Sequence, residues 1–332
     1  MKVGLVCYGD IPTGLGTEAR WMFCNLPLTW LQVQHQYHGW GKDYDNPNVR
    51  HALPIGNING CLAEEFDGFL FVERPFLTDD TLAECKERGK KLVCIVMPEW
   101  LPPSLSWLPY IDRFIAFTQQ GYEHCQRIGL GDRTVRLQQP VDLRELPYRQ
   151  RTRVERMMYC DGWGGVQERK GWPEIQEANA LGANIIIKSL RKNVGAAADT
   201  INLYADADAV VVPGKFDGVG LTLLEAMASG CIVLATDAPP YNEFLAAAYD
   251  EAGGCPCLLK VKERYNVRIW DHEWPAVKCD PADIADAAKK VRTLPTQEVL
   301  GYSGAGRKYI EQEHGAPAWK ALWEAVTVWP SS

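Results

Sequence analysis

The sequence contains two successive series of short apolar runs, and longer amphipathic stretches separate the runs within each series. The runs occupy residues 2–8, 68–72, 91–97 and 113–117 in the first series and 155–163, 184–190, 209–213 and 231–236 in the second. Runs rich in Val, Ile, Leu and Phe that alternate with helical patterns are typical of parallel sheets covered by helices on both faces. The sequence therefore predicts an α/β protein with two Rossmann-like domains.

The second series begins after a stretch that contains Pro140 and Pro147 and is rich in arginine. The chain has 332 residues, which is enough for two cores of about 150 residues each. We predict an N-terminal domain at residues 1–147 and a C-terminal domain at residues 148–332, and leave open whether the last helix packs back on the first domain. The arginines are interpreted as a solvated connector rather than a patch for a polyanion. They are Arg144, Arg149, Arg151, Arg153 and Arg156.

Composition argues against several classes of protein. No run approaches the roughly 20 apolar residues of a membrane-spanning helix, and the opening MKVGLVCYGD indicates a strand rather than a signal peptide. The net charge of −7 argues against a general binder of duplex DNA or anionic lipid. The 11 cysteines form no CxxC pair, which favours buried thiols over a zinc site. We therefore expect a cytoplasmic protein without stable membrane insertion.

Residues 248–278 interrupt the alternation of strands and helices. The segment contains Gly253, Gly254 and Pro256 together with Trp270 and Trp274. This composition predicts a long irregular excursion, and long loops of this kind are commonly functional. We leave open whether the segment acts as a lid or contributes to an acceptor site.

The strongest chemical pattern is FDGVGLTLLEAMASGCIVLAT at residues 216–236. A strand that ends at Pro213 is followed by a glycine-rich loop, and a helix is expected to begin near Leu221. Ligands of open parallel sheets bind at the carboxyl ends of strands, where a helix N-terminus attracts phosphate. Asp217 in the loop and Glu225 in the helix could then bind two different sets of hydroxyl groups. The pattern leaves open the alternative of an ordinary helix N-terminus with surface acids.

This segment, with the following DAPPYNEF, resembles the donor-site motif of retaining glycosyltransferase family 4. Members of that family have the GT-B fold, in which two Rossmann-like domains face each other across a cleft. The family phrase is similar to EGFGLxxLEAMAxGxPVVAT, so Asp217 replaces its first Glu and Glu225 matches its second. The resemblance implies that Asp217 contacts hydroxyls of the transferred sugar and that Glu225 holds the ribose of the nucleotide. It also implies that the backbone amides of Gly220, Leu221 and Thr222 contact the diphosphate, and Gly218 is counted with them among the donor-binding residues.

The resemblance extends over most of the chain. Residues 9–26 are similar to the family's glycine-rich loop after the first strand, which implies that Gly14, Leu15 and Gly16 close over the diphosphate. Residues 113–143 resemble the end of the family's first domain, and YADADAVVVPG resembles a strand of its second. Because the DAD at 206–208 lies at a helix-to-strand junction, we favour a structural interpretation over a metal site.

The chain departs from the family pattern at the diphosphate. The family phrase GRLxxxKG supplies an Arg and a Lys, whereas DGWGGVQERKG supplies Lys170 but has glycine where the Arg is expected. A cation must still offset the charge of the leaving diphosphate. We assign this role to Arg169, with Lys188 and Lys215 as further candidates.

A second departure concerns the catalytic cleft and the nucleotide base. The family's usual His-Asp pair falls near VMPEWLPP, which makes Glu99 a candidate for contact with the transferring sugar. A purely structural proline-rich turn is the alternative. The segment from residue 188 to residue 204 is shorter than in typical members, so the donor stays open between a UDP-sugar and a GDP-sugar.

The resemblance predicts a retaining, metal-independent glycosyltransferase, a hexosyl- or pentosyltransferase that moves a sugar from a nucleotide-diphosphate donor to a hydroxyl acceptor. The nucleotide sugar is a substrate, and no cofactor or metal is expected. The acceptor stays open among a carbohydrate, a small molecule and a hydroxymethylated nucleic-acid base. A non-catalytic nucleotide-sugar-binding protein is a further alternative, because the usual Arg is missing and Asp replaces Glu. The catalytic candidates are Glu99, Arg169, Lys170 and Asp217.

Overall fold

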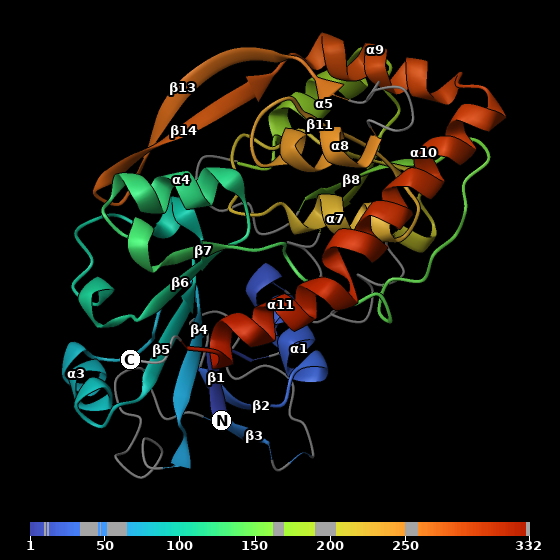
Figure 1. The fold of residues 1–332 in the computed structure, drawn as a ribbon. Coiled ribbons are helices and arrows are strands. Elements are labelled where there is room, and N and C mark those ends of the chain that lie inside the picture. Colours follow the sequence, from blue (N-terminus) through green and yellow to red (C-terminus); the bar gives the residue numbers. More distant parts are fainter. Residues whose placement is uncertain are drawn as a thin grey trace. The chain divides into compact units, whose positions relative to one another are not determined.

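The structure is a computed structural model that describes residues 1–9, 11, 13–33, 46, 48–51, 65–161, 169–189, 204–249 and 258–329. The chain divides into two compact units, Met1–Pro140 together with Ala318–Ser332, and Val141–Pro317. The division at Pro140 precedes the boundary expected at residue 147, and the C-terminal residues group with the first unit. Each unit contains a parallel sheet (Figure 1), so the predicted class of two Rossmann-like α/β halves is confirmed.

Among the described residues, the first unit has a sheet of seven parallel strands in the order β3-β2-β1-β4-β5-β6-β7. The central strand β4 is buried along its whole length, as expected for a parallel sheet covered on both faces. The strands are β1 (Val3–Tyr8), β2 (Leu28–Val33), β3 (Val49–His51), β4 (Gly68–Val72), β5 (Lys91–Ile95), β6 (Arg113–Ala116) and β7 (Thr134–Arg136).

Helices of the first unit begin after threonines whose hydroxyl oxygens accept a hydrogen bond from a backbone N–H of the first turn. Such caps satisfy donors that have no partner within the helix. The capped helices are α1 (Gly14–Asn25, capped by Thr13), α3 (Asp79–Glu87, capped by Thr78) and α4 (Gln119–Arg127, capped by Thr118). Short 3-10 turns are η1 (Pro98–Trp100), η2 (Leu108–Tyr110) and η3 (Gly131–Arg133).

The C-terminal helix α11 (Ala316–Thr327) connects the end of the chain to the first unit. The Arg113 guanidinium at the start of β6 donates to the backbone oxygens of Ala325 and, at 3.0 Å, Val328. The same guanidinium lies 4.2 Å from the centre of the Trp329 ring. These contacts hold the C-terminal residues against the start of β6.

Among the described residues, the second unit has a sheet of five parallel strands in the order β12-β11-β10-β8-β9. The strands are β8 (Met157–Asp161), β9 (Ile186–Ser189), β10 (Ala209–Val212), β11 (Ile232–Thr236) and β12 (Leu258–Leu259). The helices are α5 (Trp172–Ala180), α7 (Leu221–Ala228), α8 (Tyr241–Tyr249), α9 (Pro281–Arg292) and α10 (Thr296–Tyr309), and a π-helical turn, η7 (Ile310–His314), follows α10. Within the described residues, none of the helices combines the length and the hydropathy needed to cross a bilayer.

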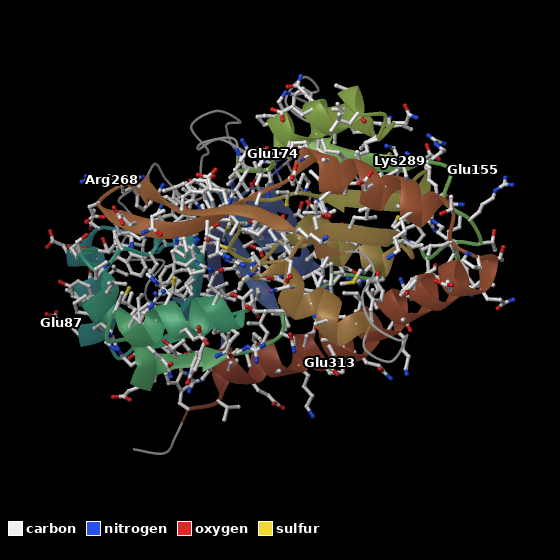
Figure 2. The ribbon with its side chains drawn as sticks, turned by 90° about the horizontal axis from the view of Figure 1, so that it is seen from above. Glu87, Glu155, Glu174, Arg268, Lys289 and Glu313 are labelled. Atoms are coloured by element: carbon white, nitrogen blue, oxygen red, sulfur yellow. The ribbon has the colours of Figure 1, made fainter. Side chains whose placement is uncertain are left out.

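The prediction of an irregular excursion over residues 248–278 is wrong for its second half, which forms a regular hairpin. Strands β13 (Val261–Ile269) and β14 (His272–Cys279) pair antiparallel. Val267 and Ile269 on one strand and Trp274 and Ala276 on the other are buried, which is the period-two pattern of a half-buried sheet. Exposed residues such as Arg268 alternate with them and point away from the protein (Figure 2). Residues 250–257 lie outside the described part of the chain.

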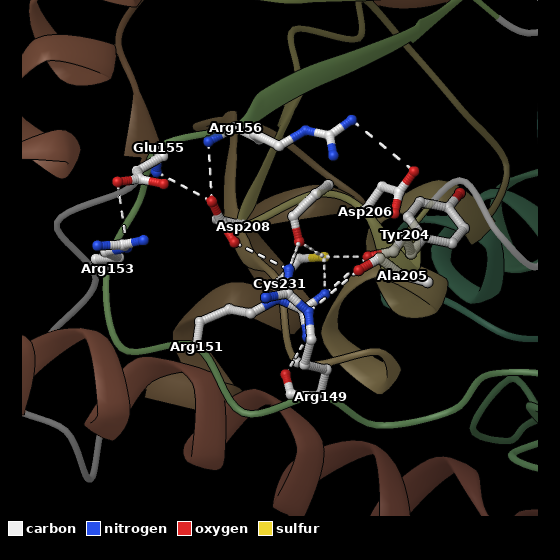
Figure 3. Close-up of polar contacts among 12 residues, drawn as sticks. Arg149, Arg151, Arg153, Glu155, Arg156, Tyr204, Ala205, Asp206, Asp208 and Cys231 are labelled. Atoms are coloured by element: carbon white, nitrogen blue, oxygen red, sulfur yellow. Dashed lines mark hydrogen bonds and ion pairs between the residues drawn. The ribbon is translucent and has the colours of Figure 1, made fainter.

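The arginine-rich stretch is not a uniformly solvated connector, because Arg151 is only 1% exposed. Its guanidinium donates to the backbone oxygens of Tyr204 at 2.7 Å, Ala207 at 2.9 Å and Ser229 at 2.9 Å (Figure 3). A buried guanidinium must satisfy its five N–H donors. Arg151 therefore joins segments that are far apart in sequence, and the interpretation of this residue as solvated is wrong.

Candidate functional site

The candidate site lies in the second unit, at the carboxyl ends of β10 and β11. Strand β10 ends at Val212, a buried loop follows, and α7 begins at Leu221, where the sequence predicted a helix start. Gly220 precedes the helix with a φ of 84°, a left-handed conformation that glycine adopts without strain, and provides no side-chain cap. The Leu223 N–H donates to the Gly220 oxygen at 2.9 Å, so the N–H groups of Leu221 and Thr222 and the positive end of the helix dipole are the groups placed to bind an anion.

Asp217 in this loop is contacted by the two predicted cations. Lys170 Nζ pairs with Asp217 Oδ2, and Arg169 Nη1 lies 3.5 Å from Oδ1. The Gly218 N–H donates to Oδ1 at 3.1 Å. Burial alone would raise the pKa of Asp217, but the charges of Lys170 and Arg169 outweigh burial and hold this pKa below its ordinary value. Asp217 is therefore a carboxylate at neutral pH, and the structure brings three predicted site residues together.

Arg169 and Lys170 are neighbours in sequence, and neighbours in an extended strand point to opposite faces. Here they lie in a turn, and Gly171, with a φ of 77°, starts α5 directly after them. The Arg169 backbone oxygen accepts a hydrogen bond from Lys215 N at 2.7 Å, which fixes the turn against the loop after β10. Both cationic side chains can consequently reach one carboxylate.

Lys215 had been a further candidate for the diphosphate, but it is engaged elsewhere. Its Nζ lies 3.3 Å from Glu174 Oε1, and Glu174 on α5 is 1% exposed (Figure 2). Lys278 of β14 lies 3.9 Å from the same oxygen. The Lys215 backbone oxygen also accepts from Val277 N of β14 at 2.9 Å. The Lys215 side chain is therefore directed to a buried carboxylate that ties the hairpin to α5.

Glu225 lies half-buried on α7, in the helix predicted to carry it. The hydroxyl of Tyr204 donates to Glu225 Oε2 at 2.7 Å. Burial of Tyr204, and secondarily the charge of Glu225, raise the pKa of that phenol well above its ordinary value, so it stays a neutral donor. Tyr204 thus orients the Glu225 carboxylate, a role that sequence reasoning missed although Tyr204 opens a segment that had been singled out.

Tyr241 is a second residue that sequence reasoning missed. It is the first residue of α8 and is completely buried. Its hydroxyl donates to Asp217 Oδ2 at 3.4 Å. Tyr241 stands in the PPYNEF segment, which is part of the sequence that resembles the family. A tyrosine among apolar residues is usually a core residue. The local sequence therefore does not predict its contact with Asp217.

The site residues predicted in the first unit are placed as follows. Gly14, Leu15 and Gly16 form the first turn of α1 rather than a loop, and the Gly16 N–H donates to Thr13 Oγ1 at 3.1 Å. The expectation of a glycine-rich loop is wrong at these residues, because the threonine cap starts the helix there. Glu99 lies in η1 after β5 and is 2% exposed. Its contact with a sugar stays a prediction.

A cavity of about 580 Å³ lies at the opposite end of the second sheet, before β8 and β10. Its charged side chains pair with one another: Arg149 with Asp208, Arg153 with Glu155 and Arg156 with Asp206 (Figure 3). Asp208 Oδ2 also accepts from the backbone N–H groups of Glu155 and Arg156. Asp208 of the DAD thus binds the backbone just before β8, and that the motif binds no metal stays a prediction. Within the described residues, no three His, Cys, Asp or Glu side chains gather in a group that could hold a metal ion.

Comparison with known proteins agrees with this geometry. Residues 177–253, which include α7, Asp217 and Glu225, match the family model of glycosyl transferases group 1. Over 98 residues the chain is 34% identical to the lipopolysaccharide core biosynthesis mannosyltransferase LpsB of Rhizobium meliloti (strain 1021). This region is 26% of the chain and 28% of the mannosyltransferase, so the similarity spans less than a third of that protein.

Solved structures share the fold at low sequence identity. Anabaena HepE, solved with UDP and glucose, has a TM-score of 0.65 and 12% identity, and the match covers 99% of this chain and 100% of HepE. Sucrose-phosphate synthase of Thermosynechococcus elongatus has a TM-score of 0.62 and 11% identity, with 97% of each chain covered. The match to the glycosyl transferases group 1 model is thus confined to residues 177–253, and the chain as a whole shares the GT-B fold of these solved structures.

Proposed function

We propose that this protein is a retaining glycosyltransferase that moves a sugar from a nucleotide-diphosphate donor to a hydroxyl acceptor without a metal ion. The observation that carries the proposal is the convergence of Lys170 and Arg169 on Asp217, in the loop that leads into the uncapped N-terminus of α7. Two cations, a carboxylate and helix N–H groups thereby occupy one region. They match a donor in which a diphosphate adjoins a ring with several hydroxyls.

In this proposal the diphosphate lies against the first turn of α7, at Gly220, Leu221 and Thr222. Cleavage of the glycosidic bond leaves negative charge on the diphosphate, so cations beside it bind the transition state more strongly than the ground state. Lys170 and Arg169 supply this charge, which a divalent ion supplies in metal-assisted transfer. The donor phosphate accepts the proton of the acceptor hydroxyl, so the proposal needs no separate protein base.

When the donor binds, Asp217 must exchange some of its present hydrogen-bond partners for hydroxyl groups of the sugar. A carboxylate offers about four lone-pair positions, and in the structure each Asp217 oxygen already has two contacts. Arg169 and Gly218 N–H contact Oδ1, and Lys170 and the Tyr241 hydroxyl contact Oδ2. A diphosphate carries more negative charge than Asp217 and competes for both cations. Their transfer to the diphosphate frees one acceptor position on each oxygen, which the sugar hydroxyls can fill.

Glu225 is assigned to the ribose of the donor. Its carboxylate is held by the Tyr204 hydroxyl and lies on the same helix whose N-terminus binds the diphosphate. A ribose follows the diphosphate in a nucleotide sugar, so a fixed carboxylate further along the helix suits its hydroxyl pair. Whether the donor is a UDP-sugar or a GDP-sugar is left to experiment.

The proposal includes a cytoplasmic location. Six of the described cysteines are buried and have free thiols, namely Cys7, Cys85, Cys94, Cys125, Cys231 and Cys279. Burial raises the pKa of Cys125 and of Cys231 to about 11, which keeps these thiols protonated and unreactive. Reduced, buried thiols suit a reducing compartment.

The test is a binding and turnover screen with UDP, GDP, UDP-glucose and GDP-mannose. Ligands that bind the folded state raise the melting temperature, so at least one nucleotide and its sugar should stabilise the protein. Hydrolysis of that donor, followed by NMR of the released sugar, should give the anomer that the donor carried. Absence of binding to a broad panel of nucleotide sugars would remove the proposal, and inversion of the anomer would remove the retaining mechanism.

A further inference from the structure

We infer that Tyr241 is a positioning residue, which keeps Asp217 aimed at the donor sugar after the cations have moved to the diphosphate. The inference rests on the proposed function and deepens it, because it assigns the discrimination of the sugar to a residue of α8, outside the loop and helix that carry Asp217 and Glu225. It concerns Tyr241, Asp217 and the glycines of the loop, all within the second unit.

The Tyr241 side chain is packed into the loop that carries Asp217. A Cβ built on Gly214 would lie 1.9 Å from the Tyr241 hydroxyl oxygen and 2.5 Å from Cζ of its ring. A Cβ on Gly220 would lie 3.1 Å from the ring carbon Cε1. In the structure these glycines leave room for Tyr241. The ring thereby contacts both ends of the loop.

The hydroxyl group adds a function that packing alone does not need. Phenylalanine would supply the same ring, whereas a hydroxyl that is completely buried is unfavourable unless it makes a hydrogen bond. Here the hydroxyl donates to Asp217 Oδ2 at 3.4 Å, the oxygen that also binds Lys170. Tyr241 is thus a neutral donor to the carboxylate whose other side-chain partners are cations.

The neutrality of Tyr241 matters when the donor binds. A diphosphate attracts Lys170 and Arg169 by charge, but it exerts no comparable pull on a phenol or on the Gly218 N–H. These two neutral donors, one on each oxygen, remain on Asp217 throughout the exchange. They fix the direction of the remaining lone pairs and so select which sugar hydroxyls Asp217 can accept. Removal of the Tyr241 hydroxyl should therefore weaken recognition of the sugar and leave recognition of the nucleotide intact.

The experiment compares dissociation constants of the full chain for UDP and UDP-glucose, or for GDP and GDP-mannose if the wild type binds those. In Tyr241→Phe the affinity for the nucleoside diphosphate should stay within about twofold, while the affinity for the nucleotide sugar should fall about tenfold. Tyr249→Phe is the matched control, because Tyr249 is also completely buried on α8 and packs its ring 5.4 Å from that of Tyr302. It should change neither constant. Thermal denaturation verifies that each variant is folded.

A double-mutant cycle separates positioning from general disturbance. If Tyr241 acts through Asp217, then Tyr241→Phe should have no further effect on sugar affinity in an Asp217→Asn background. An unchanged nucleotide-sugar affinity in Tyr241→Phe, an equal loss for diphosphate and nucleotide sugar, or full additivity in the cycle would each overturn the inference alone. A wild type that binds none of the four ligands would overturn the proposed function, and the inference with it.

Discussion

Replacement of Lys170 by methionine is the most direct perturbation of the candidate site. The change removes the ammonium and keeps a flexible apolar stem of similar length. Lys170 makes the closer of the two cationic contacts with Asp217, and its side chain is only 18% exposed. We expect Lys170→Met to lower kcat strongly, because one of the two charges that offset the leaving diphosphate is lost.

The size of the effect follows from the kind of contact that is removed. One charge-assisted contact to a developing oxyanion contributes about 3 kcal/mol, which corresponds to roughly a hundredfold in kcat. The folded state should also lose about 1 to 3 kcal/mol of stability, because a partly buried Asp217 loses its nearest cation. Asp217 keeps Arg169 at 3.5 Å, the Gly218 N–H and the Tyr241 hydroxyl. The larger loss typical of an orphaned buried charge is therefore not expected.

The assay is steady-state donor hydrolysis or transfer, with urea unfolding measured on the same preparations. Lys260→Met is the control, because the Lys260 side chain is 84% exposed and its ammonium lies 3.9 Å from Asp283 at the surface. The double variant Lys170→Met/Asp217→Asn should regain the stability that Lys170→Met loses, because no buried carboxylate is then left without its nearest cation. Its kcat should stay low, because the cation beside the diphosphate is still absent. Arg169→Met should also lower kcat, with a smaller loss of stability. If Arg169→Met kept a normal kcat while Lys170→Met had a strongly lowered kcat, the assignment of a cation pair would be refuted.

Further expectations concern the ribose, the pH, the metal and the packing of the site. Glu225→Ala should raise the donor KM about tenfold with the fold intact, since one hydrogen-bonding charged group is lost; unchanged donor affinity would contradict the ribose assignment. The lowered pKa of Asp217 contributes stability that is fully present above its ordinary value of 3.8 and is lost as the pH falls below it, so unfolding of Asp217→Asn should depend less on pH in that acidic range. EDTA should leave turnover unchanged, and a loss restored by Mn²⁺ or Mg²⁺ would contradict metal independence. Gly214→Ala should destabilise by about 1 to 3 kcal/mol through its clash with Tyr241, and urea titration in a Tyr241→Ala background should show a smaller loss.

Much of the sheet could be predicted because parallel strands buried on both faces are continuous apolar runs. The runs at 68–72, 91–97, 209–213 and 231–236 correspond to β4, β5, β10 and β11. Strand β2 was missed, because it begins at Leu28, shortly after α1 ends at Asn25, without a strong turn pattern between them. The hairpin β13–β14 was missed for a related reason. Its turn contains Trp270 at a φ of 53° instead of the glycine or asparagine that usually marks such a turn.

The residues of the candidate site also divide into those that the sequence predicts and those that it does not. Asp217 and Glu225 stand in one local phrase of loop and helix, and Arg169 and Lys170 stand in an earlier phrase of the sequence. Each phrase can be recognised on its own, and the structure brings Asp217 of the later phrase into contact with both cations of the earlier one. Contacts that depend on distant segments could not be predicted. Arg151 belongs to a polar stretch by sequence, yet its acceptors come from residues 204, 207 and 229, which meet only in the folded unit.

The partners of Asp217 explain why one carboxylate serves both stability and chemistry. In the structure its two oxygens hold two cations and two neutral donors, so the negative charge of Asp217 offsets one of the two positive charges of Lys170 and Arg169 before any donor binds. Two cations confined side by side without an anion would repel each other in a partly buried loop. Asp217 reduces that repulsion and keeps both side chains in place. A diphosphate can then replace it as their counter-ion, so the proposed donor releases the carboxylate for the sugar through the same contacts that bind the leaving group.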